Sequence, residues 1–277
     1  TAPHTPWMPT PEFRGKSQVD WYGDFVAQVD DAIGRIVRTI DDAGLGNDTL
    51  VIFTSDNGGV SAGDAFSTSN LPLRGGKGYQ FEGGIREPYF IKVPWLAAGG
   101  QKCDTPVTGT DFYPTLLELA GIPLKPYEHA DGMSLVPLLK GKTIPGRQLV
   151  WHYPHYGNQG GEPSSVIRLG DWKLIHYYED GRQELYNLRI DGQESTDVAR
   201  SHPAVVGRLS KRLFAYLKEV GARFPEKDPE YREELEKKHL EEVLKNRLPQ
   251  LEKQRLLFLS KDFDPGNNWW GSKVTRD

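Results

Sequence analysis

The longest regular pattern of apolar residues lies near the start of the chain and predicts a helix over residues 17–44. Its apolar side chains recur at intervals of three and four, which places them on one face of a helix, and Gly44 supplies a stop signal. Apolar runs over 49–54 and 89–93 predict two short strands, and residues 111–121 predict a second helix. Helix, strand, long loop, strand and helix in this order are typical of a layered α/β domain.

The pattern changes after residue 146. Four short segments rich in Val, Ile, Tyr and Trp, with Gly-Asp and Asp-Gly turns between them, predict a small antiparallel sheet over 148–153, 165–169, 172–178 and 184–188. An amphipathic helix is expected over 203–221, and a charged helix within 226–257 is expected to break before Pro249. We therefore expect an α/β domain over 1–146, a subdomain of antiparallel sheet and helix over 147–221, and a charged helical tail over 222–277.

Composition narrows the class of protein. The 277 residues hold 34 Lys and Arg against 38 Asp and Glu, so the net charge of −4 gives no basic excess that would indicate a nucleic-acid partner. We expect no membrane span, because no apolar run is long enough to cross a bilayer. The single cysteine, Cys103, excludes an internal disulfide, and we expect it to be a small semi-buried residue rather than a nucleophile.

The end of the first predicted strand carries the most informative residues. The run from Leu50 to Thr54 is followed by Ser55, Asp56, Asn57, Gly58 and Gly59. Side chains just beyond the carboxyl end of a strand often form the site of an α/β protein, and carboxylate and amide oxygens are hard ligands for Ca²⁺ or Mg²⁺. The two glycines would let the backbone approach a bound group. The same residues are also typical of a strand followed by a capped turn, so at this point both interpretations stay open.

The glycine-rich loop that follows decides between these interpretations. It contains Gly76-Lys77-Gly78, Glu82-Gly83-Gly84 and Arg86-Glu87-Pro88, and together with the Asp-Asn-Gly-Gly strand end it closely resembles the sulfatase family. The resemblance covers residues 1 to about 200. Further segments that resemble the family are Pro3–Pro6, Gln28–Gly34, Thr110–Gly121, Gly170–Leu174 and Glu184–Leu188.

The resemblance implies an alkaline-phosphatase-like α/β fold, with a mixed sheet flanked by helices, and hydrolysis of sulfate monoesters. It implies that Asp56 and Asn57 are two ligands of a divalent cation, usually calcium, that Lys77 contacts the sulfate, and that His4 lies near the leaving-group oxygen. These roles are physically reasonable. A cation and a lysine stabilise negative charge where it develops as the S–O bond breaks, and a histidine can protonate the leaving alcohol.

Other candidate residues have two interpretations each. Arg74 could bind substrate or could pair with Glu82 or Glu87. His152 and His155 could contact a sugar or an aryl group, or could be structural histidines. Together with Tyr153, Tyr156 and the nearby Trp151, these two histidines suggest an aromatic, hydrogen-bonding rim suited to a sugar. We therefore expect a sulfated carbohydrate rather than a simple aryl sulfate as the substrate.

The residues that would complete a sulfatase site are missing from the chain. The Cys/Ser-x-Pro-x-Arg motif that supplies the formylglycine nucleophile is absent, as are the paired aspartates that complete the metal site. By the resemblance, both are expected upstream of residue 1, so the sequence resembles the C-terminal part of a sulfatase. We expect this chain alone to be inactive and to bind a cation weakly, because hard cations prefer six to eight oxygens.

Two other functions compete with this hypothesis. One is a phosphodiesterase or phosphonate hydrolase of the same superfamily, which shares much of the metal scaffold. The other is a non-catalytic glycan-binding or assembly protein on a degenerate sulfatase scaffold. The tail over 222–277 lies outside the resemblance, and its tryptophans suggest contact with its own domain or with a second subunit in a homo-oligomer.

Overall fold

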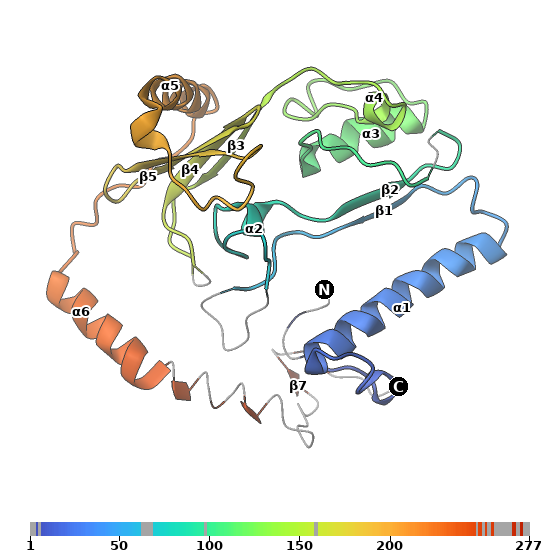
Figure 1. Cartoon of the computed structure of the whole chain (residues 1–277), viewed down its shortest axis with the longest axis horizontal. Helices are drawn as coiled ribbons and strands as arrows, with labels where there is room; N and C mark the ends of the chain where they lie inside the picture. Colours follow the sequence, from blue (N-terminus) through green and yellow to red (C-terminus); the bar gives the residue numbers. More distant parts are fainter. Residues whose placement is uncertain are drawn as a thin grey trace.

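A computed structural model gives the arrangement of the chain in space (Figure 1). It describes residues 4, 7–61, 69–96, 99–157, 160–247, 249–250, 253 and 256–257, and the backbone of 268–269 and 272–273.

The first part of the described chain is an α/β layer built around a two-stranded sheet. β1 (Val51–Thr54) and β2 (Tyr89–Lys92) are antiparallel, with Phe53 opposite Phe90. The other elements of this part are the 3₁₀ turns η1 (Pro11–Phe13) and η2 (Gly109–Asp111) and the helices α1 (Asp20–Asp42), α2 (Glu82–Ile85), α3 (Phe112–Leu119) and α4 (Val136–Leu139).

The second part is a four-stranded antiparallel sheet covered by a helix. The sheet has the order β3-β4-β5-β6, and the helix α5 (Pro203–Glu219) follows the short turn η3 (Ala199–Ser201). The strands are β3 (Gln148–Tyr153), β4 (Ser164–Leu169), β5 (Trp172–Tyr177) and β6 (Gln183–Asn187).

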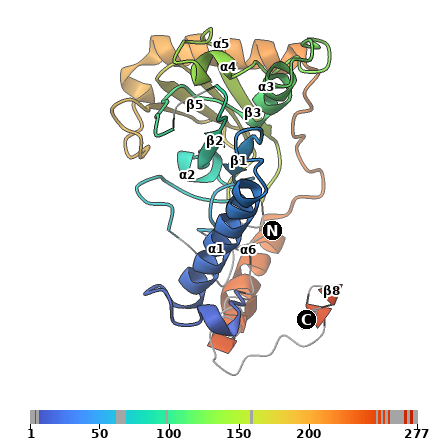
Figure 2. The ribbon, with the colours of Figure 1, turned by 90° about the vertical axis from the view of Figure 1, so that its right-hand side faces the viewer.

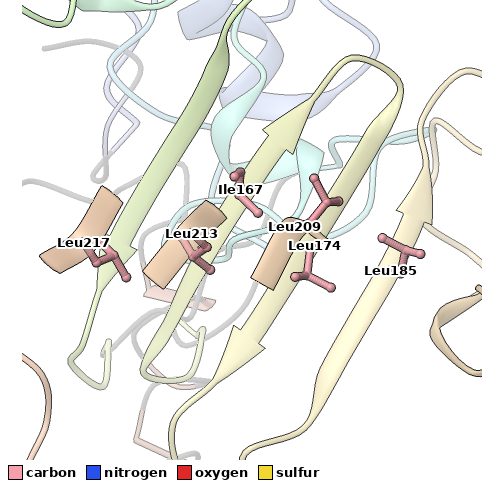
Figure 3. Close-up of a cluster of buried hydrophobic side chains, with 6 residues drawn as sticks. All are labelled: Ile167, Leu174, Leu185, Leu209, Leu213 and Leu217. Atoms are coloured by element: carbon pink, nitrogen blue, oxygen red, sulfur yellow. The ribbon is translucent and has the colours of Figure 1, made fainter. Parts of the chain in front are cut away.

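Successive side chains of these strands point to opposite faces of the sheet, so each face has its own set of residues. Ile167, Leu174 and Leu185 lie side by side across the strands on the face toward α5. They pack against leucines that recur every four residues of α5, and all six side chains are almost completely buried (Figure 3). The leucines of α5 are Leu209, Leu213 and Leu217. The opposite face of the sheet turns toward α2. This face lines the cavity described below.

The tail projects from the body of the molecule. Helix α6 (Glu233–Glu242) continues into a π-helical turn, η4 (Val243–Arg247), and none of their side chains is buried. Helices α1 and α6 both point away from the two sheets (Figures 1 and 2). A short pair of strands, β7 (Asn268–Trp269) and β8 (Ser272–Lys273), follows. The homo-oligomer contact through this tail stays a prediction, and Trp270 lies outside the described residues.

Most predicted elements are confirmed, with small shifts at their ends. The charged helix is shorter than the segment 226–257 that was expected to contain it, and α2 and α4 were not predicted. Cys103 is exposed, not semi-buried. Among the described residues, no helix is both long and apolar enough to span a membrane. The division of the chain at residues 146 and 221 stays a prediction.

Candidate active site

A cavity of about 850 Å³ lies between the end of β1, the glycine-rich loop and the small sheet. It brings together Asp56, Asn57 and Lys77, the three residues on which the sequence argument depended most. The opposite wall comes from β3 and β4 and from the segment before β4. The residues of that wall are Trp151, Tyr153, Glu162, Ser164 and Val166.

Asp56 and Asn57 follow β1 directly, as the sequence predicts. The side chain of Asp56 is exposed to the cavity and that of Asn57 is half-buried. The hydroxyl of Ser55 donates a hydrogen bond of 2.8 Å to the carbonyl of Asn57 and thereby closes the turn. The oxygens of two adjacent residues therefore line the cavity at one strand end.

Gly58 has a packing role that the sequence did not predict. A Cβ atom on Gly58 would lie 1.8 Å from the carbonyl oxygen of Gly83, so only glycine fits there. The amide of Gly58 donates a hydrogen bond of 3.2 Å to the carbonyl of Gly84. Gly58 thus packs the turn against α2, whereas the approach of the backbone to a bound group stays a prediction.

Asn70 connects the Asp56–Asn57 turn to the loop of Lys77, a role that sequence reasoning missed. Its side-chain oxygen accepts a hydrogen bond from the amide of Gly59, and its side-chain nitrogen donates to the carbonyls of Gly59 and Gly75. An isolated asparagine in a loop is a common turn residue, so nothing in the sequence distinguishes it.

Lys77 lies across the cavity from the wall of the small sheet and is half-buried. Its backbone amide donates a hydrogen bond of 3.0 Å to the carbonyl of Gly59. The backbone of Lys77 is therefore fixed relative to the Asp56–Asn57 turn, and the residue lines the cavity.

Glu87 adds a second acid next to Asp56. Burial, followed by the negative charge of Asp56, raises the pKa of Glu87 to about 7. Its Oε1 atom is buried and has no hydrogen-bond partner, as is the hydroxyl of Tyr89, which also lines the cavity. A cation near Asp56 would relieve the repulsion between the two acids, so the residues fit a divalent cation held in part by Asp56 and Asn57. Within the described residues, no cluster of three or more His, Cys, Asp or Glu side chains is arranged to complete such a site.

Aromatic and acidic side chains form the wall opposite Lys77. Trp151 and Tyr153 are two residues apart on β3 and therefore share the cavity face of the sheet. Glu162 is held by Arg182, whose Nη2 atom lies 2.5 Å from Glu162 Oε1. The guanidinium of Arg182 lies 3.6 Å above the ring of Tyr177, which fixes its orientation.

His152 does not reach the cavity. It lies between Trp151 and Tyr153 on β3, so alternation turns it to the α5 face of the sheet. Its Nδ1 atom lies 2.6 Å from the hydroxyl of Ser165, and its Nε2 atom lies 2.7 Å from the carbonyl of Arg223. Both ring nitrogens are thus engaged in structural contacts, which corrects the expectation of a substrate contact.

His155 and Arg74 also lie outside the cavity lining. His155 is exposed and packs its ring edge to face with Tyr153. The Nη1 atom of Arg74 donates to the hydroxyl of Tyr186 at 2.9 Å and to the carbonyl of Glu194 at 3.0 Å. Arg74 is therefore a structural residue, although its partners are not Glu82 or Glu87 as the sequence suggested.

His4 is exposed, and the cavity lining does not include it. The structure therefore brings Asp56 and Asn57 together with Lys77 but not with His4, and the roles of all four residues stay predictions.

Two family models match the sequence. The model described as "Sulfatase" matches residues 1–122, and the model described as "N-sulphoglucosamine sulphohydrolase, C-terminal" matches residues 76–219. The second match alone covers more than half of the chain. The chain belongs to the sulfatase family.

Individual proteins are also similar to this chain. Human steryl-sulfatase is 40% identical over 156 residues, which are 54% of this chain and 27% of the relative. The N-acetylgalactosamine-6-O-sulfatase of Bacteroides thetaiotaomicron is 31% identical over 234 residues, which are 76% of this chain and 44% of the relative. The solved structure of Ps i-CgsB in complex with k-i-k-neocarrahexaose is 27% identical, has a TM-score of 0.67 and matches 78% of this chain and 48% of its own.

The matches also show how much of each related protein this chain covers. The chain spans less than half the length of these three proteins. The two curated relatives are named as sulfatases. The alkaline-phosphatase-like α/β fold expected from the resemblance is confirmed by the similarity to the solved structure. No Cys/Ser-x-Pro-x-Arg motif occurs in the 277 residues, so a formylglycine nucleophile would have to come from outside them.

Proposed function

We propose that this chain supplies the cation-ligand pair, the sulfate-binding lysine and the leaving-group wall of a sulfatase that acts on sulfated carbohydrates. Asp56 and Asn57 hold part of a divalent-cation site, with calcium as the expected ion, and Lys77 contacts the sulfate. The observation that carries the proposal is that these three side chains line one cavity.

The chemistry of the three residues suits a sulfate monoester. The ester is anionic, and negative charge grows on its bridging oxygen as the S–O bond breaks. A lysine opposite a bound cation would attract the sulfate and stabilise that charge, and a site closed on two sides keeps the interaction stronger than in bulk water. A bound divalent cation would add Lewis-acid polarisation of the sulfate oxygens.

The wall opposite Lys77 supports a carbohydrate as the alcohol part of the ester. Trp151 and Tyr153 offer apolar ring faces, and Glu162 offers a carboxylate that accepts hydrogen bonds from hydroxyl groups. The contact with Arg182 holds Glu162 in place. A sterol would leave this carboxylate in an apolar contact, which is unfavourable. Two of the compared relatives fit the same class, since one is named for an N-acetylgalactosamine sulfate and the other is seen with a neocarrahexaose.

The substrate class is tested by calorimetric titration of the 277-residue chain with galactose 6-sulfate, inorganic sulfate and galactose. We expect galactose 6-sulfate to bind at least about tenfold more tightly than galactose, since only the ester engages Lys77. Trp151→Ala should weaken binding of galactose 6-sulfate and leave binding of inorganic sulfate unchanged. Trp95→Ala is the control, because Trp95 is half exposed and lies outside the cavity lining. Equal losses for both ligands in Trp151→Ala would contradict the carbohydrate assignment.

We further expect the isolated chain to show no turnover, because it has no formylglycine motif. The measurement is hydrolysis of 4-nitrophenyl sulfate in the presence of calcium. A rate well above the uncatalysed background would overturn this part of the proposal.

A further inference from the structure

The loop that carries Lys77 is tied at both ends to one buried residue of the small-sheet subdomain. The amide of Glu82, at the end of the loop, donates a hydrogen bond of 2.5 Å to Glu194 Oε2. Arg74, at its start, donates from Nη1 to the backbone carbonyl of Glu194 at 3.0 Å. Lys77 lies between these two anchors, so Glu194 fixes both ends of the segment that presents it.

A buried lysine compensates the negative charges of the two buried glutamates, Glu82 and Glu194. Lys173 on β5 is completely buried, and its Nζ atom lies 2.7 Å from Glu194 Oε1 and 3.1 Å from Glu82 Oε1. Arg168, directly opposite Lys173 on β4, lies 3.5 Å from the other oxygen of Glu82. Two carboxylates and two cations thus balance in charge, whereas removal of one member would leave an uncompensated buried charge.

Glu194 adopts a backbone conformation that the rest of the protein must maintain. Its φ of 54° lies in the left-handed region, which a residue with a long side chain rarely occupies. Its carboxylate is completely buried beneath the loop. A residue held in an unusual conformation by several contacts is a common feature of functional sites.

The contacts continue from this cluster to the cation-ligand pair. The amide of Gly83 donates to the carbonyl of Arg74, and Gly84 accepts from the amide of Gly58, next to Asn57. Lys77 donates from its own amide to Gly59. The segment anchored by Glu194 therefore contacts the Asp56–Asn57 turn at two points.

From this geometry we infer that Glu194 and Lys173 are positioning residues, which set the Lys77 loop against the Asp56–Asn57 turn across the boundary between the α/β layer and the small sheet. We call the contacts of Glu194 and Lys173 with the Lys77 loop the clamp. The inference rests on the proposed function, because the clamp serves to place Lys77. It gives the small sheet a role in sulfate binding beyond that of a cavity wall.

Hydrogen exchange of the 277-residue chain tests the clamp without any ligand. In Glu194→Gln, which keeps an acceptor oxygen but removes the charge, amides of residues 74–85 should exchange at least about tenfold faster, and Lys173→Met should have a larger effect. Amides of β4, β5 and α5 should change by less than about twofold. Asp197→Asn is the matched control, since this acid of the same segment binds the amides of Leu185 and Ala199 and not the loop.

Affinity for inorganic sulfate, measured well below the melting temperature of each variant, separates positioning from general stability. Glu194→Gln should weaken sulfate binding about tenfold, while Asp197→Asn leaves it unchanged. The inference is overturned if exchange in 74–85 stays at the wild-type rate in Glu194→Gln, or if it rises only in parallel with β4 and β5. It is also overturned if the loop loosens but sulfate affinity is unaltered. Failure of the wild-type chain to bind sulfate would instead count against the proposed function, and exchange would still decide whether the clamp exists.

Discussion

Glu87 is the residue whose ionisation should be most visible in the stability of the chain. Its pKa is raised from 4.5 to about 7 by burial and by Asp56. Because the folded state favours the protonated acid, this contribution to stability is complete below pH 4.5 and is lost as the pH rises through 7. Glu87→Gln removes the titration, so the variant should gain stability relative to wild type as the pH rises.

Urea unfolding without divalent cations checks this prediction. The quantity of interest is the free energy of unfolding of Glu87→Gln minus that of wild type. We expect this difference to be about 1 kcal/mol larger at pH 8 than at pH 5. The expected change is small because the side chain of Glu87 is only half-buried and solvent screens its charge. An identical difference between the two proteins at both pH values would refute the assigned role of burial and Asp56. Added calcium should reduce the effect, because a cation near Asp56 favours the ionised form of Glu87.

Gly58 tests the close packing between the Asp56–Asn57 turn and α2. An added Cβ would overlap the carbonyl oxygen of Gly83, so Gly58→Ala should destabilise the chain by about 1–3 kcal/mol. Gly207 on α5 has open space around its Cα, and Gly207→Ala should stabilise the helix by about 0.5–1 kcal/mol. Thermal unfolding of both variants provides the measurement, and a neutral Gly58→Ala would show that the turn and α2 are not tightly packed.

At the scale of elements, the small sheet and α5 form the best-packed unit of the chain. Leu213 is completely buried against β4 and β5 (Figure 3), so Leu213→Ala should cost about 2–5 kcal/mol in unfolding free energy. Leu235 on α6 is 62% exposed, and Leu235→Ala should change stability by less than about 0.5 kcal/mol. Comparable losses in the two variants by chemical denaturation would mean that α6 packs against the protein in solution.

Elements were predictable where they depend on local patterns. The strands of the small sheet follow from alternation and turn residues, and α5 follows from its four-residue leucine spacing. The same alternation could have placed His152 on the face opposite to Trp151 and Tyr153, because successive residues of a strand point to opposite faces. The error there was to group residues by their nearness in sequence.

Other features were not predictable because they depend on distant parts of the chain. Glu82 and Glu194 are hydrogen-bonded although 112 residues separate them. Neither residue lies in a sequence pattern that indicates a buried carboxylate paired with Lys173. Asn70 and Gly58 likewise owe their roles to backbone groups from other segments. The family motif located Asp56, Asn57 and Lys77 correctly at one cavity, whereas the contacts that hold them are visible only in the fold.

At the scale of the whole molecule, the two parts of the chain meet at the cavity. The α/β layer contributes Asp56, Asn57 and Lys77, and the small sheet contributes Trp151 and Glu162. Neither part alone contains both Lys77 and the wall with Trp151 and Glu162. The proposed function therefore requires that the two parts act together, and that Lys77 and a cation held by Asp56 and Asn57 bind the same anion.

Calorimetric titration of the 277-residue chain with inorganic sulfate, with and without calcium, tests this central claim most directly. We predict that calcium tightens sulfate binding in the wild type, that Lys77→Met weakens it about tenfold in either condition, and that Asp56→Asn abolishes the effect of calcium. Sulfate binding that is indifferent to Lys77→Met and to calcium would contradict the account.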